Sequence, residues 1–495
     1  MIILVTRIFI VFFLCAIGLI FKEDVFSKEL PRIPKPKKAS FSNMSIFVDA
    51  ETKVIAAEEL KKQFPDAFQS LENVLKELPS ITKNSSTADE SLKKQLPDVF
   101  QSFENVLKGL LSVKKNYSII VKILSNEDKS LLKGDIASAL LHREAYWIDI
   151  SKESIKVIGT DSFGVLCGIT TLEKILHERK GKVYQGSVLD WPDHRIRALH
   201  LVLRGTDPEN IKQLMKIARY GHYNTLIVEM GDAVILSTNA HIARKDAWTK
   251  DVFLDVIQTA RENGLTVIPE LKLLTHQEKL LKNKYPHLMF NKSTYDPRKE
   301  EVYMTVLPMV DEIINLIRPK AFHIGHDEVA GSNEHSKKKW LLKEEEILPS
   351  ELYLKDTERI HIYLKERGVE TWMWGDMLVA ANEFPTMLTK HLHGTQDYVS
   401  LRDKIPKDIV ICDWHYFDGQ TEFPSALSFV KAGHKVLGAT WKFDKTIKNF
   451  SRYIANLPTG GEGMIATTWF HVQKKEWDTV NKIILTSSEA FWNVK

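Results

Sequence analysis

The sequence contains few cysteines and no motif of a cofactor-dependent protein. Only Cys15, Cys167 and Cys412 occur among its 495 residues, which is too few and too scattered for a disulfide framework or a zinc knuckle. The sequence has no glycine-rich phosphate loop, and its histidines do not fall at metal-ligand spacing. The net charge of +4 comes from dispersed lysines. We therefore expect no cofactor, no metal and no nucleic-acid partner.

Long apolar runs are also scarce, and the run near the N-terminus is short. Arg7 precedes an apolar stretch, Ile8–Phe21, which is shorter than the ~20 residues of a membrane-spanning helix. Residues 1–27 are therefore predicted to be an export signal, with cleavage after Ser27. An uncleaved membrane anchor stays open, because Ile2–Val5 extends the apolar character upstream. In both cases the protein is expected to be exported, as a periplasmic, extracellular or membrane-anchored protein.

The length and composition favour a soluble protein of two domains. The sequence is 44% apolar and 27% charged, as in ordinary globular proteins, and it is too long for one core. Residues 28–43, rich in proline and lysine, are predicted to be a linker. Residues 44–185 are predicted to form an α+β domain. Its expected strands are Ser45–Val48, Tyr117–Leu124, Ala145–Ile150 and Ser154–Ile158, and its expected helix is Gly164–His177.

This small domain contains an internal repeat. Residues 58–80 return as residues 90–112, at a constant offset of 32 positions. Two copies are too few for a self-supporting solenoid. The repeat is interpreted as a local duplication that lengthens a helical excursion, with a partner-binding helical hairpin as the alternative.

Residues 186–495 contain eight β-like runs, each followed by a helix-like stretch. The runs are apolar and bounded by polar residues, glycine or proline, as in strands that are buried on both faces. The runs are Ile196–Leu203, Thr225–Met230, Thr266–Leu271, Ala321–Glu328, Thr371–Met377, Ile409–Tyr416, Lys435–Trp441 and Met464–Phe470. The clearest helical stretches are Glu209–Tyr220, Asp251–Asn263, Lys299–Ile317 and Glu351–Arg367. This order predicts a (β/α)8 TIM barrel whose active site lies at the C-terminal ends of its strands.

The fourth run ends in two adjacent carboxylates, Asp327 and Glu328. Adjacent residues of a regular strand point to opposite sides. The two can share a pocket only if the chain leaves strand geometry at Asp327, which Gly325 and the segment Ala330–Ser332 make plausible. A catalytic pair is the favoured interpretation. The alternative is that one carboxylate caps the next helix while the other is solvated.

Several segments resemble one known family. They are Tyr146–Ile150, Gly159–Gly164, Thr171–Leu176, Asp190–Arg197, Val267–Glu270 followed by His276, and His323–Glu328. In their order and spacing they are similar to glycoside hydrolase family 20, the β-N-acetylhexosaminidases, over most of the chain after the linker. The resemblance implies hydrolysis of a glycan that bears a terminal N-acetylhexosamine.

The departures from the family pattern indicate a branch. Val202 stands where an aspartate is usual, Glu229 lies near the usual histidine, and His326 replaces a second glycine. With Trp374–Leu378 on the fifth run, the sequence resembles the hexosaminidase D-like branch. The preference between N-acetylglucosamine and N-acetylgalactosamine stays open.

The resemblance assigns roles to the two carboxylates. Glu328 would be the general acid that protonates the glycosidic oxygen and later the base that activates water. Asp327 would orient the substrate's 2-acetamido group, whose oxygen attacks the anomeric carbon in substrate-assisted catalysis. Repulsion between the neighbouring carboxylates, with partial burial, would raise the pKa of Glu328.

The sugar pocket is expected to be built from aromatic and hydrogen-bonding side chains near strand ends. Trp374, Trp414 and Trp469 are candidate walls, although each could be a core residue. Tyr416 resembles the family tyrosine that donates to the acetamido carbonyl. The remaining candidates are Arg197, His276 and Asp376. Arg197 could reach sugar hydroxyls or instead make a salt bridge that closes the barrel. His276 could orient a carboxylate and Asp376 could bind a sugar hydroxyl, although either could be a loop or cap residue.

The sequence is compatible with two functions from different classes. The first is an exo-acting retaining β-N-acetylhexosaminidase. The second is a non-catalytic carbohydrate-binding protein on a degenerate hydrolase scaffold, which Val202, Glu229 and His326 would fit. The retained pair of Asp327 and Glu328 favours the enzyme, because a binding protein has no need of a buried acid.

Overall fold

The structure is a computed structural model that describes residues 34–78, 117–332, 337, 341–388 and 392–494. The predicted export segment, residues 1–27, lies outside these residues, and so does the second copy of the repeat, residues 90–112. Within this part of the chain, no helix combines the length and the apolar character that crossing a membrane requires. All residues described below belong to one compact unit that begins at Arg32.

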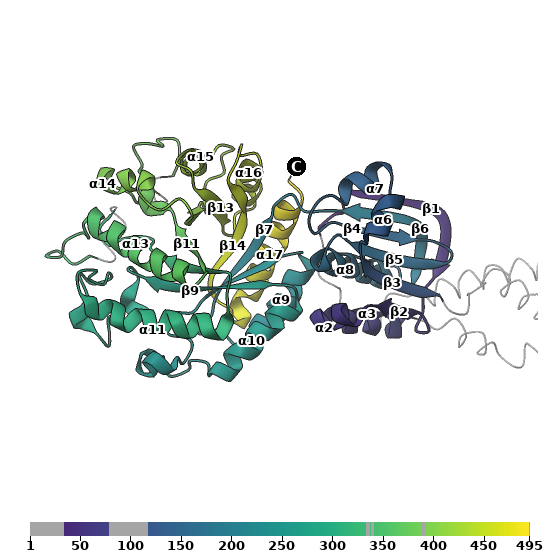
Figure 1. The fold of residues 1–495 in the computed structure, drawn as a ribbon, viewed down its shortest axis with the longest axis horizontal. Helices are drawn as coiled ribbons and strands as arrows, with labels where there is room; N and C mark the ends of the chain where they lie inside the picture. The colour runs from purple at the N-terminus through teal and green to yellow at the C-terminus, as the bar shows by residue number, and fades with distance from the viewer. Residues whose placement is uncertain (1–33, 79–116, 333–336, 338–340, 389–391, 495) are drawn as a thin grey trace, which may run out of the picture. The chain divides into compact units, whose positions relative to one another are not determined.

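The small domain is built on a sheet of six strands in the order β1-β6-β4-β5-β3-β2 (Figure 1). The strands are β1 (Lys38–Phe47), β2 (Lys53–Ala56), β3 (Ser118–Ile123), β4 (Tyr146–Ile150), β5 (Ser154–Gly159) and β6 (Lys182–Asp190). The helices are α2 (Glu58–Gln63), α3 (Pro65–Glu77), α6 (Asn126–Leu131), α7 (Gly134–Ala139) and α8 (Ser162–Glu178). Helix α8 packs on β4 and β5 and against α3, and buried side chains of these elements form the core of the domain.

The structure moves both predicted boundaries of this domain. Strand β1 begins at Lys38 and pairs antiparallel with β6, so residues 38–43 are part of the sheet and not of a linker. Strand β6 runs to Asp190 and pairs with β4 up to that residue, so the domain extends beyond residue 185. The start of β1 was missed because its side chains are mostly exposed and give no apolar alternation.

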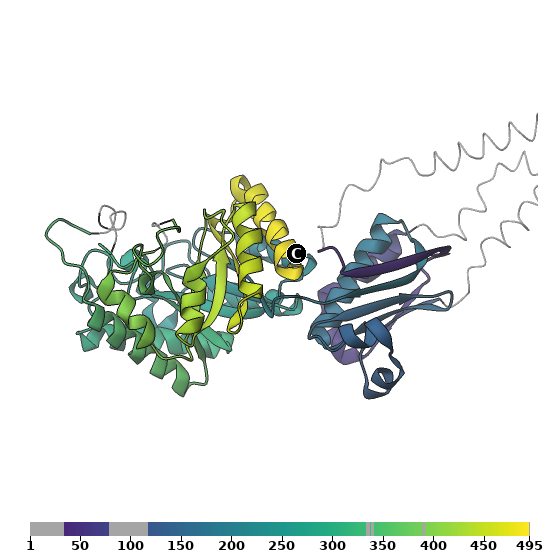
Figure 2. The ribbon, with the colours of Figure 1, turned by 90° about the horizontal axis from the view of Figure 1, so that it is seen from above.

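The C-terminal part is a closed barrel of eight parallel strands with helices around it (Figures 1 and 2), which confirms the predicted fold. The strands are β7 (Ile196–Val202), β8 (Thr225–Glu229), β9 (Thr266–Leu273), β10 (Ala321–Gly325), β11 (Glu370–Trp374), β12 (Val410–Trp414), β13 (Lys435–Thr440) and β14 (Gly461–His471). The helices that follow them are α9 (Pro208–Tyr220), α10 (Lys250–Glu262), α11 (Glu300–Ile317), α13 (Ser350–Glu366), α14 (Gln396–Val399), α15 (Pro424–Lys431), α16 (Asp444–Ala455) and α17 (Trp477–Trp492).

Side chains that point into the barrel change character along the strands. Alternate residues of a strand face the same side, and the apolar Ile268 of β9 belongs to the interior cluster. It is followed at alternate positions by Glu270 and Lys272, both buried. In the same way His200 follows Ala198 on β7. Because the strands are parallel, these polar groups gather at one rim, where the C-terminal ends of the strands meet.

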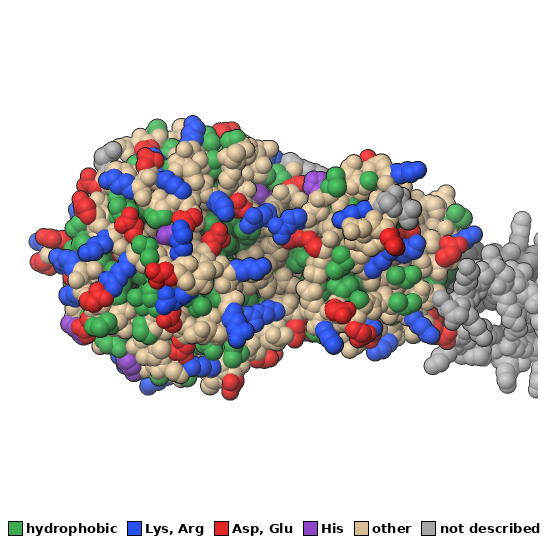
Figure 3. Space-filling model, viewed as in Figure 1, with side chains coloured by type: hydrophobic (Ala, Val, Ile, Leu, Met, Phe, Trp, Pro, Cys, Tyr) green, Lys and Arg blue, Asp and Glu red, His purple; other side chains and the backbone are tan. Residues whose placement is uncertain are grey.

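Charged side chains of both signs are spread over the surface. Figure 3 shows lysine and arginine interspersed with aspartate and glutamate over the face that it draws. This mixture is the pattern expected from the dispersed lysines of the sequence.

Arg197 lies at the opposite end of the barrel from the polar rim, so its prediction as a sugar ligand is wrong. It is the second residue of β7 and only 1% exposed. Its guanidinium forms an ion pair with Glu144 of the small domain and donates to the carbonyl oxygens of His194 and His222, at 2.7 and 2.9 Å. The alternative prediction, a structural salt bridge, is closer to its role, although the bridge reaches the small domain.

Two neighbouring arginines allow the buried ion pair to be tested. Arg197→Leu should lower the free energy of unfolding by about 3–5 kcal/mol, because it leaves the Glu144 carboxylate without its partner. Arg195 pairs with Glu462 at 3.1 Å, but its side chain is 56% exposed, so Arg195→Leu should cost no more than about 1 kcal/mol. Urea denaturation of both variants measures the difference, and equal losses would contradict the assignment.

Candidate active site

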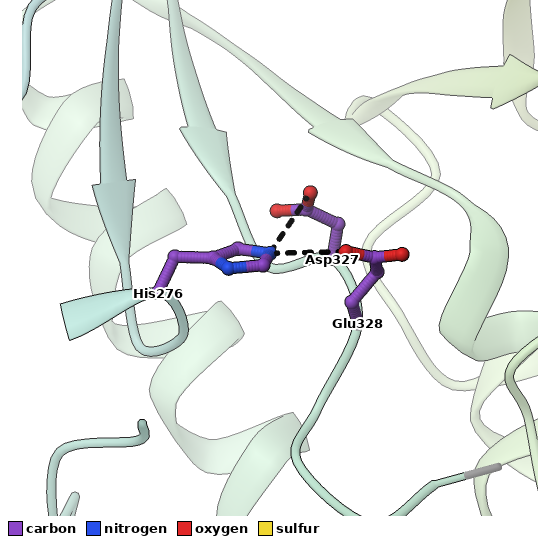
Figure 4. Close-up of side chains that lie close together, drawn as sticks. All are labelled: His276, Asp327 and Glu328. Atoms are coloured by element: carbon purple, nitrogen blue, oxygen red, sulfur yellow. Dashed lines mark ion pairs between the residues drawn. The ribbon is translucent and has the colours of Figure 1, made fainter. Parts of the chain in front are cut away.

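The catalytic pair lies on a left-handed turn directly after β10. Gly325, His326 and Glu328 have φ angles of 76°, 67° and 51°, so the chain leaves strand geometry as the sequence requires. This conformation is easy for glycine but costs about 1–3 kcal/mol for each other residue. The turn directs the side chains of Asp327 and Glu328 to the same side, toward His276 (Figure 4).

His326 is held from both sides of its ring. Its Nδ1 lies 3.1 Å from the carbonyl oxygen of Ile324, and its Nε2 lies 3.0 Å from Oδ2 of Asp356 on α13. The Tyr353 hydroxyl donates to the carbonyl oxygen of His326 at 3.0 Å. Asp356 also accepts the hydroxyls of Tyr295 and Tyr303. These bonds fix a turn that would otherwise be free to relax.

His276 joins the two carboxylates. Its Nε2 lies 3.3 Å from Oδ2 of Asp327 and 3.5 Å from Oε2 of Glu328, and Figure 4 shows the ring pointing at both. Burial would lower the pKa of His276, but the carboxylates of Asp327 and Glu328 outweigh burial and raise it. The structure therefore brings together three of the residues that the sequence selected.

Asp376 supports the turn from the neighbouring strand end. Its Oδ2 accepts the backbone N–H of Glu328 at 2.9 Å, and its Oδ1 accepts the indole N–H of Trp414 at 3.1 Å. Burial, together with the charge of Asp327, raises the pKa of Asp376 to about 8. Asp376 is thus at the site, but both of its oxygens bind protein donors, whereas the sequence suggested a sugar hydroxyl.

A second histidine, missed by the sequence analysis, flanks the acid. The Nε2 of His393 lies 3.6 Å from Oε1 of Glu328, and its Nδ1 lies 3.3 Å from the hydroxyl of Ser332. His393 belongs to the long connection after β11, well beyond the strand end. A search for polar residues at strand ends therefore does not select it.

The predicted aromatic residues form one group beside the carboxylates. Trp414 stacks on Tyr416 with ring centroids 4.8 Å apart, and the indole N–H of Trp469 donates to the Tyr416 hydroxyl at 2.8 Å. Trp374 lies 5.8 Å from Trp469, centroid to centroid. Trp374 is only 1% exposed and belongs to the apolar interior of the barrel, whereas Tyr416 and Trp469 are partly exposed.

The structure adds a buried charged chain that the sequence analysis missed. The ammonium of Lys272 lies 3.0 and 2.8 Å from the two oxygens of Asp327 and 3.4 Å from Glu270. Glu270 lies 2.8 Å from Nε2 of His200 and accepts the indole N–H of Trp374 at 3.0 Å. A signal was present, because a strand buried on both faces has no structural use for two charges at alternate positions.

Glu229, a departure from the family pattern, also lies at this rim. It ends β8 and lines a small pocket together with Lys272 and His276. The ammonium of Lys279 lies 3.5 Å from its carboxylate. Glu229 therefore contributes to the site, although its residue type differs from the histidine that is usual near this position.

Comparison with known proteins identifies the family. Residues 199–493 match the model described as "Glycosyl hydrolase family 20, catalytic domain", and residues 30–191 match "Glycosyl hydrolase family 20, domain 2". The chain belongs to glycosyl hydrolase family 20. The second match begins and ends close to the sheet of the small domain, so both parts of this family 20 chain have counterparts in the family.

Curated relatives of this family 20 chain are distant. Bovine hexosaminidase D is 28% identical over 194 residues, which are 37% of this chain and 56% of that protein. Lacto-N-biosidase of Bifidobacterium bifidum is 24% identical over 334 residues, which are 64% of this chain and 28% of that protein. The chain thus spans about half or less of the length of these relatives. The match to hexosaminidase D agrees with the branch expected from the sequence.

Solved structures of the family share the fold. The β-N-acetylhexosaminidase of Bacteroides fragilis has a TM-score of 0.62 at 17% identity, with 93% of this chain and 90% of that chain covered. The family 20 β-N-acetylhexosaminidase of Streptomyces coelicolor has a TM-score of 0.61 at 13% identity, with 93% and 91% covered. At these identities the likeness establishes the fold alone.

Three residues of this family 20 site carry ligand atoms of the kind that bind a metal cation. Ligand atoms of His276, Asp327 and Glu328 lie within 4.8 Å of one another. However, both oxygens of Asp327 already accept from the Lys272 ammonium, and this fixed cation would repel a metal ion at the same place. We therefore assign no metal to these residues.

The raised pKa of Asp376 predicts a pH dependence of stability. The folded protein keeps this proton up to about pH 8, whereas the ordinary value is 3.8, so the folded state binds more protons between these values. Stability should therefore fall as the pH rises from about 4 to 8, by at most ~1.4 kcal/mol per pH unit from this group.

Asp376→Asn should flatten that slope, because the substituted side chain does not titrate. Urea denaturation of both proteins at pH 5, 6.5 and 8 gives the two slopes. The substitution can lower stability by a constant amount through its lost hydrogen bond. Parallel pH curves for the two proteins would show that Asp376 does not hold this proton.

Proposed function

We propose that the protein is an exo-acting retaining β-N-acetylhexosaminidase. It would hydrolyse terminal β-linked N-acetylglucosamine or N-acetylgalactosamine by substrate-assisted catalysis. Membership of family 20 supports a glycoside hydrolase, and relatives named hexosaminidase D and lacto-N-biosidase support a hexosamine-containing glycan as substrate.

The observation that carries the proposal is the convergence of Asp327 and Glu328 on His276. Oxygen atoms of the two carboxylates lie within 4.8 Å of each other. Inverting glycosidases hold their carboxyl groups about 6.5–9.5 Å apart to admit a water between them, whereas retaining enzymes hold them closer. The short separation leaves too little room for such a water and therefore argues against an inverting mechanism.

Asp327 is a poor candidate for the nucleophile of a two-carboxylate mechanism. It is only 7% exposed, and both of its oxygens accept from the Lys272 ammonium. The 2-acetamido oxygen of the sugar would therefore form the bond to the anomeric carbon. As the bond to the leaving oxygen breaks, Glu328 gives that oxygen its proton, and Asp327 stabilises the positive charge that develops on the acetamido nitrogen.

The second half of the reaction returns the proton to Glu328. Water attacks the anomeric carbon of the oxazolinium intermediate while the Glu328 carboxylate takes a proton from that water. The bond between the anomeric carbon and the acetamido oxygen breaks, which restores the acetamido group with net retention. His276 and His393, at 3.5 and 3.6 Å from Glu328, would hold the carboxyl group in place during both steps.

A non-catalytic carbohydrate-binding protein is not favoured. The changes at Val202, Glu229 and His326 motivated that alternative, but Glu229 lines the pocket beside His276 and His326 is bonded into the turn that carries the acid. A binding site needs neither this turn nor two adjacent carboxylates. A catalytic role of Asp327 and Glu328 would account for the conformational energy that the positive φ angles of this turn require.

Glu328→Gln should remove most turnover of unactivated substrates while sugar affinity is retained. General acid–base catalysis contributes about 100- to 10,000-fold, so a loss in this range is expected for β-linked N-acetylglucosaminide disaccharides. Release of N-acetylhexosamine measures the rate. Glu366→Gln, at an exposed position on α13, is the matched control and should leave the rate unchanged. Equal activity of Glu328→Gln and the control would refute the acid role.

Inhibition by a thiazoline that mimics the oxazoline tests the internal nucleophile. The inhibitor should compete with nitrophenyl β-N-acetylglucosaminide and galactosaminide, and Asp327→Asn should weaken it, because the amide cannot offset the positive nitrogen. Competition kinetics with both proteins give the inhibition constants. A wild-type enzyme that hydrolyses these glycosides but ignores the thiazoline would rule out the substrate-assisted route.

A further inference from the structure

Lys272 is a buried lysine in direct contact with the proposed catalytic carboxylate. It lies near the C-terminal end of β9, and its side chain is 10% exposed. Its Nζ donates to Oδ1 and Oδ2 of Asp327 at 3.0 and 2.8 Å and lies 3.4 Å from Oε1 of Glu270. Asp327 thus accepts the side-chain hydrogen bonds of this ammonium group, and Glu270 lies at ion-pair distance from it.

The surrounding charges leave the negative charge on Asp327 available. Glu270 is fully buried and accepts from Trp374, so it provides a fixed negative charge beside Lys272. Glu270 and Lys272 offset each other, and the three groups together keep one net negative charge at the end that faces the pocket. The rings of Trp469 and Trp374, 5.1 and 5.7 Å from the ammonium, add further stabilisation of the cation.

We propose that Lys272 is a positioning residue that fixes both the orientation and the ionised state of Asp327. This inference rests on the proposed function, in which Asp327 must be a carboxylate when positive charge forms on the acetamido nitrogen. By engaging both oxygens, Lys272 restrains rotation of the carboxylate about its side-chain bonds. Because Lys272 lies on strand β9 and is itself paired with Glu270, the contact sets the geometry of Asp327 as well as its charge.

The ionisation of Asp327 depends on this contact. Burial would raise the pKa of Asp327, but Lys272 and His276 outweigh burial and hold it well below its ordinary value. Burial would likewise lower the pKa of Lys272, but Asp327, Glu270 and Glu229 raise it, so the lysine stays charged. The charged or titratable groups that face this pair are Glu229, Glu270, His276, His323, Glu328, Tyr353, Asp376 and Tyr416.

A simpler role would be that Lys272 only neutralises the buried Glu270. Under that role the contact with Asp327 is incidental, and removal of both Lys272 and Glu270 charges should restore normal behaviour. Under the proposal, Asp327 loses its ammonium in either case. The two roles therefore differ in the pH dependence of catalysis.

Lys272→Met should lower kcat for nitrophenyl β-N-acetylglucosaminide at least ten-fold and move the acid limb of its pH profile to higher pH by a unit or more. The direction follows because Asp327 without its ammonium binds a proton more readily and must lose it to act. Lys272→Arg should restore the acid limb, since it keeps the charge, but not the full kcat, since its geometry differs.

The double variant Glu270→Gln/Lys272→Met decides between the two roles. Its buried charges are balanced, so it should fold even if Lys272→Met alone does not. The proposal predicts a shifted acid limb and weaker thiazoline inhibition in the double variant, whereas the simpler role predicts the wild-type profile. Lys37→Met is the control for loss of a largely buried lysine, because Lys37 binds Trp191 and Asn493 away from the site. It should lower stability without changing the pH profile.

The outcomes separate this inference from the proposed function. Wild-type activity with an unshifted acid limb in Lys272→Met, or in the double variant, overturns the positioning role alone. A wild-type protein without N-acetylhexosaminidase activity overturns the proposed function, and the role of Lys272 in it falls as well. A shifted limb in both variants, with recovery in Lys272→Arg, supports the proposal.

Discussion

The site depends on one backbone constraint, the left-handed turn that follows β10. A regular strand would send Asp327 and Glu328 to opposite faces, one toward the barrel interior and the other toward the surrounding helices. Positive φ angles at Gly325, His326 and Glu328 bring both carboxylates to the same pocket. Contacts from other elements offset the conformational energy of these positive φ angles. They come chiefly from Asp356 and Tyr353 of α13 and from Asp376 after β11.

The second constraint is the burial of charge. Isolated charges in a barrel interior are energetically costly. At this rim, acidic and basic side chains alternate, so each charge has a partner of opposite sign. Glu270, Lys272, Asp327, His276 and Glu328 lie in a chain in which each neighbouring pair can attract. An apolar layer that includes Ile268 and Trp372 fills the barrel interior beneath them. Catalytic carboxylates can therefore be partly desolvated without being left unpaired.

The fold was predictable because buried parallel strands leave a strong local signal. Each of the eight apolar runs became a barrel strand, and the side chains of Asp327, Glu328 and His276 met because parallel strands end at one rim. Arg197 was misplaced because it lies near the start of its strand, and the start of a parallel strand faces the base of the barrel. Lys272 was missed because the predicted run ended at Leu271, two residues before the end of β9.

Other features could not be read from local sequence because they arise from long-range contacts. The pairing of His326 with Asp356 joins a turn to a helix that follows it after a long connection. His393 reaches Glu328 from beyond the end of β11. Strand β1 is defined by backbone pairing to β6, not by its exposed side chains. In each case the partner residue is distant in the sequence, and no periodic pattern of apolar residues predicts the contact.

His326 shows how these constraints are connected. Where the family pattern has a second glycine, a turn of this kind needs no side-chain support, because glycine adopts positive φ freely. A histidine there adds conformational cost, yet its ring supplies two contacts, to Ile324 and to Asp356. Tyr295 and Tyr303 fix Asp356 in turn. With histidine at this position, side-chain contacts stabilise a turn that glycine would adopt without support. The position of Glu328 therefore depends on residues of α11 and α13 as well as on strand β10.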